Sequence, residues 1–238
     1  MLTETELIVL GAVRYSDNAS IVSTYSECFG ALSFKCIRSA SRRRGQANAF
    51  FIPLSILRVT LDYLPNRGIQ MPREQEIIHR PLRPSIEPVA NAVALFTVEL
   101  LTRLLRSSGA DSAMYSYLRD EIKGLEGLSD RGISSFHLRL MAGLLHYLGI
   151  LPQSETYRPG SLLDFSEGSF RLSWGPEEQG KAYASALLYQ FISTPTPEEL
   201  PLTGQERNLL LQLLLDFLAY HFPDLGTLQS PEILSQLF

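Results

Sequence analysis

The sequence is poor in cysteine, and this excludes several kinds of site. Its 238 residues include two cysteines, Cys28 and Cys36. Two cysteines cannot build a disulfide framework, and no Cys-x-x-Cys pair is present to bind zinc or exchange thiols. We therefore expect both thiols to be small buried apolar side chains, and we predict neither a metal nor a cofactor.

Motifs of the common enzyme classes are also missing. The sequence has no Gly-x-Ser-x-Gly, Gly-x-x-x-x-Gly-Lys, His-Glu-x-x-His or Gly-x-Gly-x-x-Gly. His137 and His146 fall on one predicted helix, about half a rotation out of phase, so they cannot share a ligand. We expect these two histidines, with His79 and His221, to lie at the surface or at helix ends. The prediction is a protein that is not an enzyme.

Long uninterrupted apolar runs are absent as well. The two most apolar stretches, 88–105 and 208–222, carry Glu99 and Asp216 in mid-run, which indicates buried helices and not membrane spans. The N-terminus lacks the basic start and long apolar core of a signal peptide. We therefore expect a cytoplasmic protein without a membrane partner.

Charge is present but unevenly distributed. Residues 1–84 hold 11 Lys/Arg and 7 Asp/Glu, a net charge of +4, whereas residues 85–238 hold 10 and 18, a net charge of −8. Three consecutive arginines, Arg42 to Arg44, follow closely on Lys35 and Arg38. A basic first third on an acidic remainder indicates a polyanion-binding module joined to a part with another role.

Alternating hydrophobicity predicts strands throughout the first third. Residues 31–37 place Leu32, Phe34 and Cys36 on one face, and residues 55–63 repeat the pattern. Further β-rich runs cover 7–15, 19–27 and 74–78. About five short strands without an intervening helix favour a small closed or nearly closed barrel. The OB-fold is the commonest solution, and an SH3-like barrel fits almost as well.

The hydrophobic period changes after the proline-rich segment 79–88. Residues 89–105 show helical spacing, and further helices are expected near 111–127, 133–148, 177–193, 204–222 and 231–237. Between two of these helices, Phe165, Gly168 and Phe170 indicate a β-hairpin. We thus predict an α+β protein of two domains, a barrel at 1–84 and a mostly helical domain at 85–238 with a hairpin insertion at about 152–175.

The basic segment is expected to join the third strand to the fourth and to border the ligand-binding face of the barrel. Cations there can neutralise phosphates without reading sequence. Nearby rings could stack on unpaired bases; the candidates are Tyr15, Phe34, Phe50 and Phe51. For Phe34 we favour core packing, because it shares a face with Leu32 and Cys36. This reasoning favours nucleic-acid binding over a solvated loop.

Residues 15–57 resemble the N-terminal signature of the bacterial RecO family of DNA repair proteins. The matching positions are Asp17, Gly30, Arg38, Arg42, Arg43, Arg44, Ala49 and Pro53. Residues 89–105, 136–152 and 207–234 resemble the family's first long helix, its helix ending in Leu-Gly-x-x-Pro, and its closing helix and turn. The likeness runs along nearly the whole chain.

The resemblance implies a recombination mediator without turnover chemistry, associated with the nucleoid. Such a protein binds single- and double-stranded DNA, anneals complementary strands, joins the partner RecR and helps load the RecA recombinase onto DNA coated by single-strand-binding protein. The predicted DNA-binding residues are Arg14, Lys35, Arg38, Arg42, Arg43, Arg44 and Arg73. The implied site for the C-terminal tail of the single-strand-binding protein comprises Arg139, Leu140, Leu144 and Arg103, with Arg106 as a further candidate.

One feature of the family is missing. Many members carry four zinc-binding cysteines after the Leu-Gly-x-x-Pro turn, but residues 151–174 contain no cysteine. We therefore expect the hairpin to be held by Phe165, Phe170, Leu172 and Trp174 without a metal. Two alternatives to the mediator stay open: a generic OB-fold protein that binds RNA or tRNA, and a helical adaptor whose basic loop contacts an acidic protein.

Overall fold

The computed structural model describes residues 2–37, 51–172, 179–194 and 200–237. By their internal contacts the residues form two compact units, Met1–Gly127 and Leu128–Phe238. The predicted fold class, a small β-barrel followed by a mostly helical region with a hairpin insertion, is confirmed. Among the described residues, no helix combines the length and the apolar character needed to cross a bilayer.

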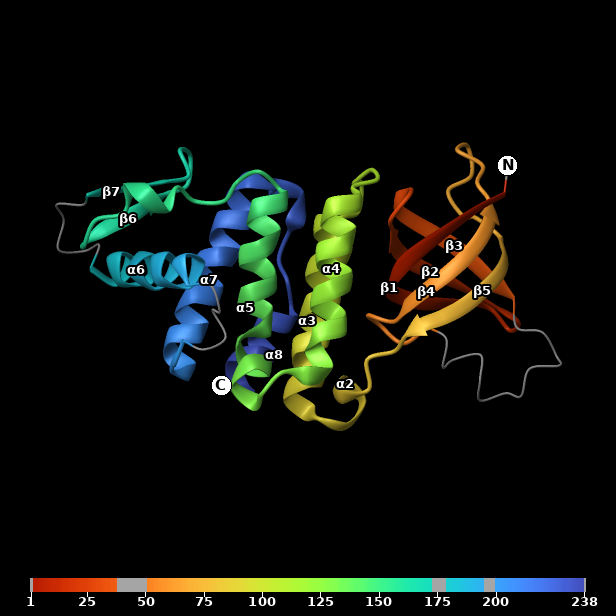
Figure 1. Ribbon diagram of the computed structural model, residues 1–238, viewed down its shortest axis with the longest axis horizontal. Coiled ribbons are helices and arrows are strands. Elements are labelled where there is room, and N and C mark those ends of the chain that lie inside the picture. Colours follow the sequence, from red (N-terminus) through yellow and green to blue (C-terminus); the bar gives the residue numbers. More distant parts are fainter. Residues whose placement is uncertain (1, 38–50, 173–178, 195–199, 238) are drawn as a thin grey trace. The chain divides into compact units, whose positions relative to one another are not determined.

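The first unit begins with five antiparallel strands, drawn in red to orange in Figure 1. They are β1 (Leu2–Ser16), β2 (Ala19–Ser26), β3 (Gly30–Ile37), β4 (Ile56–Asp62) and β5 (Pro72–His79). The order in the sheet is β3-β2-β1-β4-β5. All five predicted strands are present. Their alternating β-branched and polar residues fit a sheet with one buried face.

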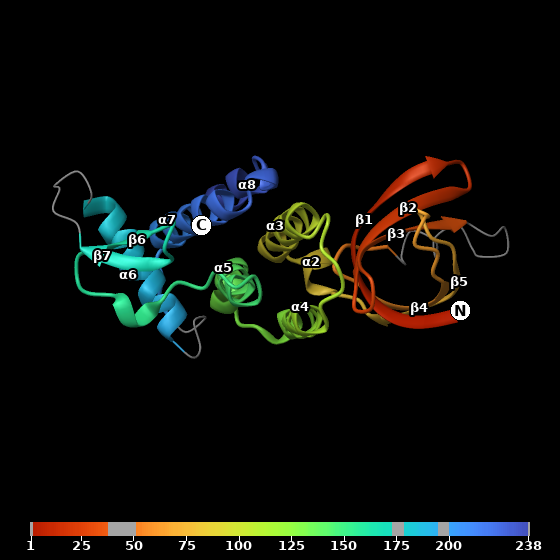
Figure 2. The same cartoon turned by 90° about the horizontal axis from the view of Figure 1, so that it is seen from above.

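The sheet curls on itself until its two edge strands meet, as the strands in Figure 2 show. A parallel bridge joins Phe34 of β3 to Gln70, just before β5. The Lys35 amide donates to the Gln70 carbonyl at 2.9 Å, and the Gln70 amide donates to the Ser33 carbonyl at 2.8 Å. The result is a nearly closed barrel of the OB type. Its core consists of Leu7, Val9, Val22, Leu32, Phe34, Leu57, Val59 and Leu61.

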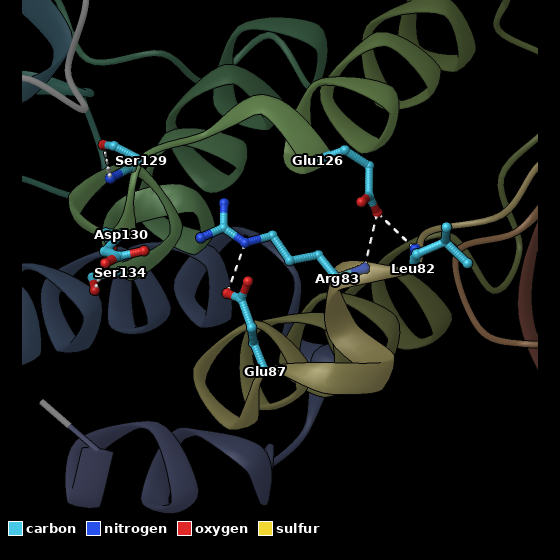
Figure 3. Close-up of polar contacts among 8 residues, drawn as sticks. Leu82, Arg83, Glu87, Glu126, Ser129, Asp130 and Ser134 are labelled. Carbon is cyan, nitrogen blue, oxygen red and sulfur yellow. Dashed lines mark hydrogen bonds and ion pairs between the residues drawn. The ribbon is translucent and has the colours of Figure 1, made fainter.

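Within the described residues the first unit continues with α2 (Arg83–Ile86), α3 (Pro88–Leu104) and α4 (Ser112–Gly124), followed by the 3-10 turn η1 (Leu125–Gly127). The Glu126 carboxylate of η1 accepts the amides of Leu82 and Arg83 at 2.7 and 3.2 Å, and the Arg83 side chain pairs with Glu87 (Figure 3). Asp111 caps α4 by accepting the Met114 amide. These contacts fix the turn between the barrel and its helices.

The second unit contains α5 (Asp130–Tyr147), α6 (Gln179–Ser193), α7 (Gly204–His221) and α8 (Ser230–Leu237), each close to its predicted range. Short 3-10 turns lie at η2 (Ser154–Thr156) and η5 (Pro223–Leu225). Ser129 caps α5, and Thr203 forms a reciprocal capping box with Glu206 at the start of α7. Local capping chemistry therefore sets the starts of both long helices.

The predicted hairpin is present as β6 (Ser161–Asp164) and β7 (Ser169–Leu172), with Gly168 at a φ of +60° in its turn. An aromatic cluster backs it: the Tyr157 ring stacks on Tyr189 at 4.0 Å and meets the Phe170 ring edge-on at 5.4 Å. Leu172, expected to hold the hairpin, is half-exposed, so this expectation is wrong for that residue. Trp174 lies outside the described residues.

His137 also departs from expectation, because it is fully buried in α5 and not at the surface. Burial lowers the pKa of its imidazole to about 3, and the positive charge of Arg207 adds to the effect. His137 lies four residues after Ile133 and three before Leu140, so it shares their apolar stripe. Cys28 was expected to be buried but is exposed, whereas Cys36 is partly buried; both are free thiols.

The sheet ends at His79 and α2 begins at Arg83, close to the boundary predicted at residue 84. The compact unit nevertheless continues to Gly127. Its helices pack on the barrel, since the Tyr25 hydroxyl of β2 donates to the Met114 sulfur at 3.7 Å. That residues 1–84 form a domain on their own stays a prediction.

Candidate nucleic-acid interface

The arginine-rich segment leaves the barrel at the end of β3. Arg38, Arg42, Arg43, Arg44 and Phe50 lie outside the described residues, so their placement stays a prediction. The last residue of β3 is Ile37, and Lys35 stands two positions before it on the same strand. Lys35 and Ile37 are therefore the described residues nearest in sequence to the segment on its N-terminal side.

A groove of about 380 Å³ lies at this end of β3 and runs along the start of β5. From β3 it is lined by Lys35, Cys36 and Ile37, and from the other side by Met71, Pro72, Arg73, Glu74 and Gln75. Two predicted DNA-binding residues that are distant in sequence, Lys35 and Arg73, thus share one hollow. The curl of the sheet brings them together, because it places β3 beside the segment that precedes β5.

The loop that precedes β5 contributes Met71 to the groove. The Gln70 side chain is buried and donates to the carbonyls of Leu64 and Arg67, while its oxygen accepts the Leu64 amide at 3.1 Å. These bonds fix the connection between β4 and β5, which exposes Ile69, Met71 and Arg67. The sequence analysis did not predict these three residues. A signal was present, because Ile69 and Met71 are apolar side chains beside a polar loop that contains proline and glycine.

Tyr15 of β1 and Lys35 of β3 contact each other on the outer face of the barrel, although β2 lies between their strands. The Lys35 ammonium lies 4.9 Å from the centroid of the Tyr15 ring, within the range of a cation–π contact. Arg14, which was also predicted to bind DNA, donates to the Asp17 carboxylate at 2.5 Å, and both side chains are largely exposed. The charge of Arg14 is thus partly balanced.

The structure separates the candidate stacking rings. Phe34 is fully buried in the barrel core, as the alternation predicted, and the Phe51 ring packs edge-on against it at 6.0 Å. Both rings contribute to the core, although Phe51 is only partly buried. Tyr15 is 62% exposed. Of the three candidate rings that the structure describes, it is the most exposed and the best suited to stacking.

A cluster on β1, β4 and β5 carries the other sign of charge. Arg58 of β4 lies within 3.8 Å of carboxylates from both neighbouring strands; these belong to Glu4, Glu6 and Glu76. One arginine among three carboxylates leaves a net negative surface that disfavours phosphate. The groove of Lys35 and Arg73, by comparison, contains two cations and the single carboxylate of Glu74.

Two of the predicted tail-binding residues lie in the core of the second unit. Leu140 and Leu144 of α5 are both completely buried, so they present no surface to a peptide, and this expectation is wrong. Arg139, partly exposed on the same helix, has its guanidinium 5.7 Å from the Phe136 ring. Arg103 of α3 belongs to the first unit and pairs with Glu99 at 3.3 Å.

A different hollow in the second unit has the composition expected for such a tail. It measures about 330 Å³ and lies among β6, β7, α6 and α7. Its apolar wall includes Leu162, Phe165 and Leu213. Its charged groups are Lys181, Asp216 and the Arg171–Asp164 ion pair at 3.0 Å. Sequence reasoning missed it because its walls come from three segments, 162–171, 181–185 and 213–216, that only the fold brings together.

Comparison with known proteins gives a consistent picture. Residues 1–80 match the family model described as Recombination protein O N terminal. The chain is 28% identical over 241 residues to DNA repair protein RecO of Phocaeicola vulgatus and 29% identical over 247 residues to that of Porphyromonas gingivalis. It is 24% identical over 245 residues to the RecO protein of Flavobacterium psychrophilum. In each case the alignment covers 100% of both chains.

Proposed function

We propose that this chain, a member of the RecO family of DNA repair proteins, acts as a recombination mediator that binds and anneals DNA. The observation that carries the proposal is the shared groove of Lys35 and Arg73, which opens where the arginine-rich segment leaves β3. Annealing requires cations that neutralise two phosphate backbones without reading bases. Lys35 and Arg73 in the groove are the described cations that support the proposal.

The mediator role also implies protein partners. We propose that the protein joins RecR and helps load RecA onto DNA coated by single-strand-binding protein. The helical unit is the part proposed to bind the acidic, aromatic-ended tail of the coating protein. Such a tail needs an apolar pocket beside a cation, and the hollow that contains Phe165, Leu213 and Lys181 offers both. Arg139 remains the second candidate cation.

Salt-dependent binding of labelled poly-dT tests the DNA part of the proposal. We expect affinity that falls steeply with salt, and a variant with Arg42, Arg43 and Arg44 changed to Glu should bind more weakly. Loss of three phosphate contacts should reduce the slope of the logarithm of the binding constant against the logarithm of salt concentration by about 2. A control variant makes the same change in net charge at the exposed cations Lys123, Arg131 and Arg158. It should bind nearly as the parent protein does.

The outcomes separate the competing functions. Preference for folded RNA over poly-dT would indicate an RNA-binding protein. Absence of binding even at low salt would contradict the mediator proposal and favour an adaptor. Equal losses in the arginine variant and its control would show that net charge matters and that the segment itself does not.

A peptide titration tests the tail site. The probe is an acidic peptide ending in phenylalanine with a free carboxylate, and the same peptide with an amidated end is its control. If the hollow holds the tail, Lys181→Ala weakens binding of the free-acid peptide more than Arg139→Ala does. The reverse order would place the tail at α5.

A further inference from the structure

Tyr15 occupies an irregular position at the end of β1. The pairing of β1 with β2 joins Arg14 to Ser20 and Ser16 to Ala19, so Tyr15 is an extra residue in a β-bulge. A bulge re-aims the side chain that it carries and raises the local twist. Here the ring comes to lie over the outer face of the barrel, where the Lys35 ammonium approaches its centroid to 4.9 Å.

The surroundings of this pair are apolar and exposed. Strand register aligns Val13, Ile21 and Lys35 in one row across β1, β2 and β3. Val13 is 71% exposed and Ile37, beside the row on β3, is 57% exposed. Large apolar side chains that gather at one surface and border a basic groove are typical of a binding face, whereas scattered ones need no explanation.

We propose that Tyr15 and Lys35 form a subsite for single-stranded nucleic acid, in which the ring stacks on an unpaired base and the ammonium contacts a neighbouring phosphate. The inference rests on the proposed DNA binding and adds the form of nucleic acid that this face selects. The ligand class follows from the chemistry of the pair. A flat ring beside a cation matches a base joined to a phosphate, and the groove that contains Arg73 continues the path.

The subsite differs in its physics from the arginine-rich segment. Cations alone bind duplex and single strand through the phosphates, and their affinity depends on salt. A ring that stacks on a base requires that base to be unpaired, so its contribution is restricted to single strands and depends little on salt. Tyr15 therefore supplies the preference for single strands, and the arginines supply the general affinity.

The experiment compares poly-dT with an abasic strand of equal length, which keeps the phosphates and lacks the bases. For Tyr15→Ala we expect a loss of about fivefold to hundredfold in affinity for poly-dT with an unchanged salt slope, and almost no loss for the abasic strand. Tyr15→Phe keeps the ring and should restore binding. Lys35→Gln should weaken both strands and flatten the salt slope by about 0.7.

Controls separate stacking from general damage to the fold. Tyr220 of α7 is exposed to a similar extent but belongs to the other unit, so Tyr220→Ala should bind both strands as the parent does. Equal losses of Tyr15→Ala on poly-dT and on the abasic strand would overturn the stacking role. So would unchanged affinity for poly-dT in that variant. If the parent protein bound neither strand, the proposed DNA binding itself would fail, which is a distinguishable result.

Discussion

Gly30 lies so close to the Ser108–Gly109 peptide that a Cβ atom on it would come within 2.3 Å of the Gly109 carbonyl carbon. The backbone at Gly30 is left-handed, with a φ of +69°. Next to it, the Ala31 amide donates to the Ser108 carbonyl at 3.0 Å. The start of β3 and the loop before α4 are therefore joined backbone to backbone, which requires glycine at this position.

The substitution Gly30→Ala should be strongly destabilising. The left-handed backbone costs a non-glycine residue about 1–2 kcal/mol, and the overlap with backbone atoms adds about 1–3 kcal/mol. Gly11→Ala is the control, because a Cβ there meets no atom within 4 Å. Urea unfolding of both variants measures the difference. Equal stabilities would contradict the close approach.

Glu126 is expected to stabilise the turn that leads from the barrel to α3. Its carboxylate accepts two backbone amides, those of Leu82 and Arg83. Removing an exposed acceptor of this kind costs about 1 kcal/mol, so Glu126→Ala should lower the free energy of unfolding by that amount. Hydrogen exchange should also accelerate at the two amides. Lys123→Ala, at an exposed side chain near the end of α4, is the control and should change neither quantity.

The buried His137 should make stability depend on pH. Its pKa is about 3 in the folded protein and about 6.5 in an unfolded chain, so the unfolded state binds more protons between these values. The contribution to stability is complete above pH 6.5 and is lost as pH falls toward 3. Between pH 7.5 and 5.0 the loss from this residue should be about 2 kcal/mol.

The variant His137→Leu cannot titrate and should lose this part of the pH dependence in urea unfolding at the two pH values. His146→Gln, at an exposed position of the same helix, should retain it. A parent protein whose stability is equal at pH 7.5 and 5.0 would show that His137 is accessible to protons in the folded state.

The hairpin should depend on its aromatic cluster. Tyr157 contacts both Tyr189 and Phe170, so Tyr157→Ala removes two ring contacts and should cost about 2 kcal/mol. Leu172→Ala is the control on the same hairpin; because Leu172 is half-exposed, its loss should cost at most about 0.5 kcal/mol. Chemical denaturation compares the two, and similar costs would argue against the cluster.

A chelator should leave the protein unchanged. Residues 151–174 have no cysteine, and within the described ranges no three His, Cys, Asp or Glu side chains gather as a metal site would require. We therefore expect EDTA to leave the melting temperature unaltered and elemental analysis to find no stoichiometric zinc. One zinc ion per purified chain would falsify this expectation.

Local patterns predicted the elements of this fold well. The alternation in 31–37 and 55–63 identified β3 and β4 and placed Phe34 in the core. Helical spacing located α3 to within one residue at each end. These predictions succeeded because the period of apolar residues reflects which face of an element is buried. The same rule was not applied to His137, Leu140 and Leu144, which share one stripe of α5 and are all buried.

The sequence by itself determined the strand and helix pattern, the uneven charge and the absence of zinc-binding cysteines. The tertiary structure decided which residues meet. It placed Lys35 in one groove with Arg73 and brought the Lys35 ammonium over the Tyr15 ring. It also surrounded Arg58 with carboxylates, and it left Tyr15 exposed while it buried Phe34. The physical reason is that periodicity gives the orientation of a side chain on its own element, whereas the curl of the sheet and a single bulge determine its neighbours from distant strands.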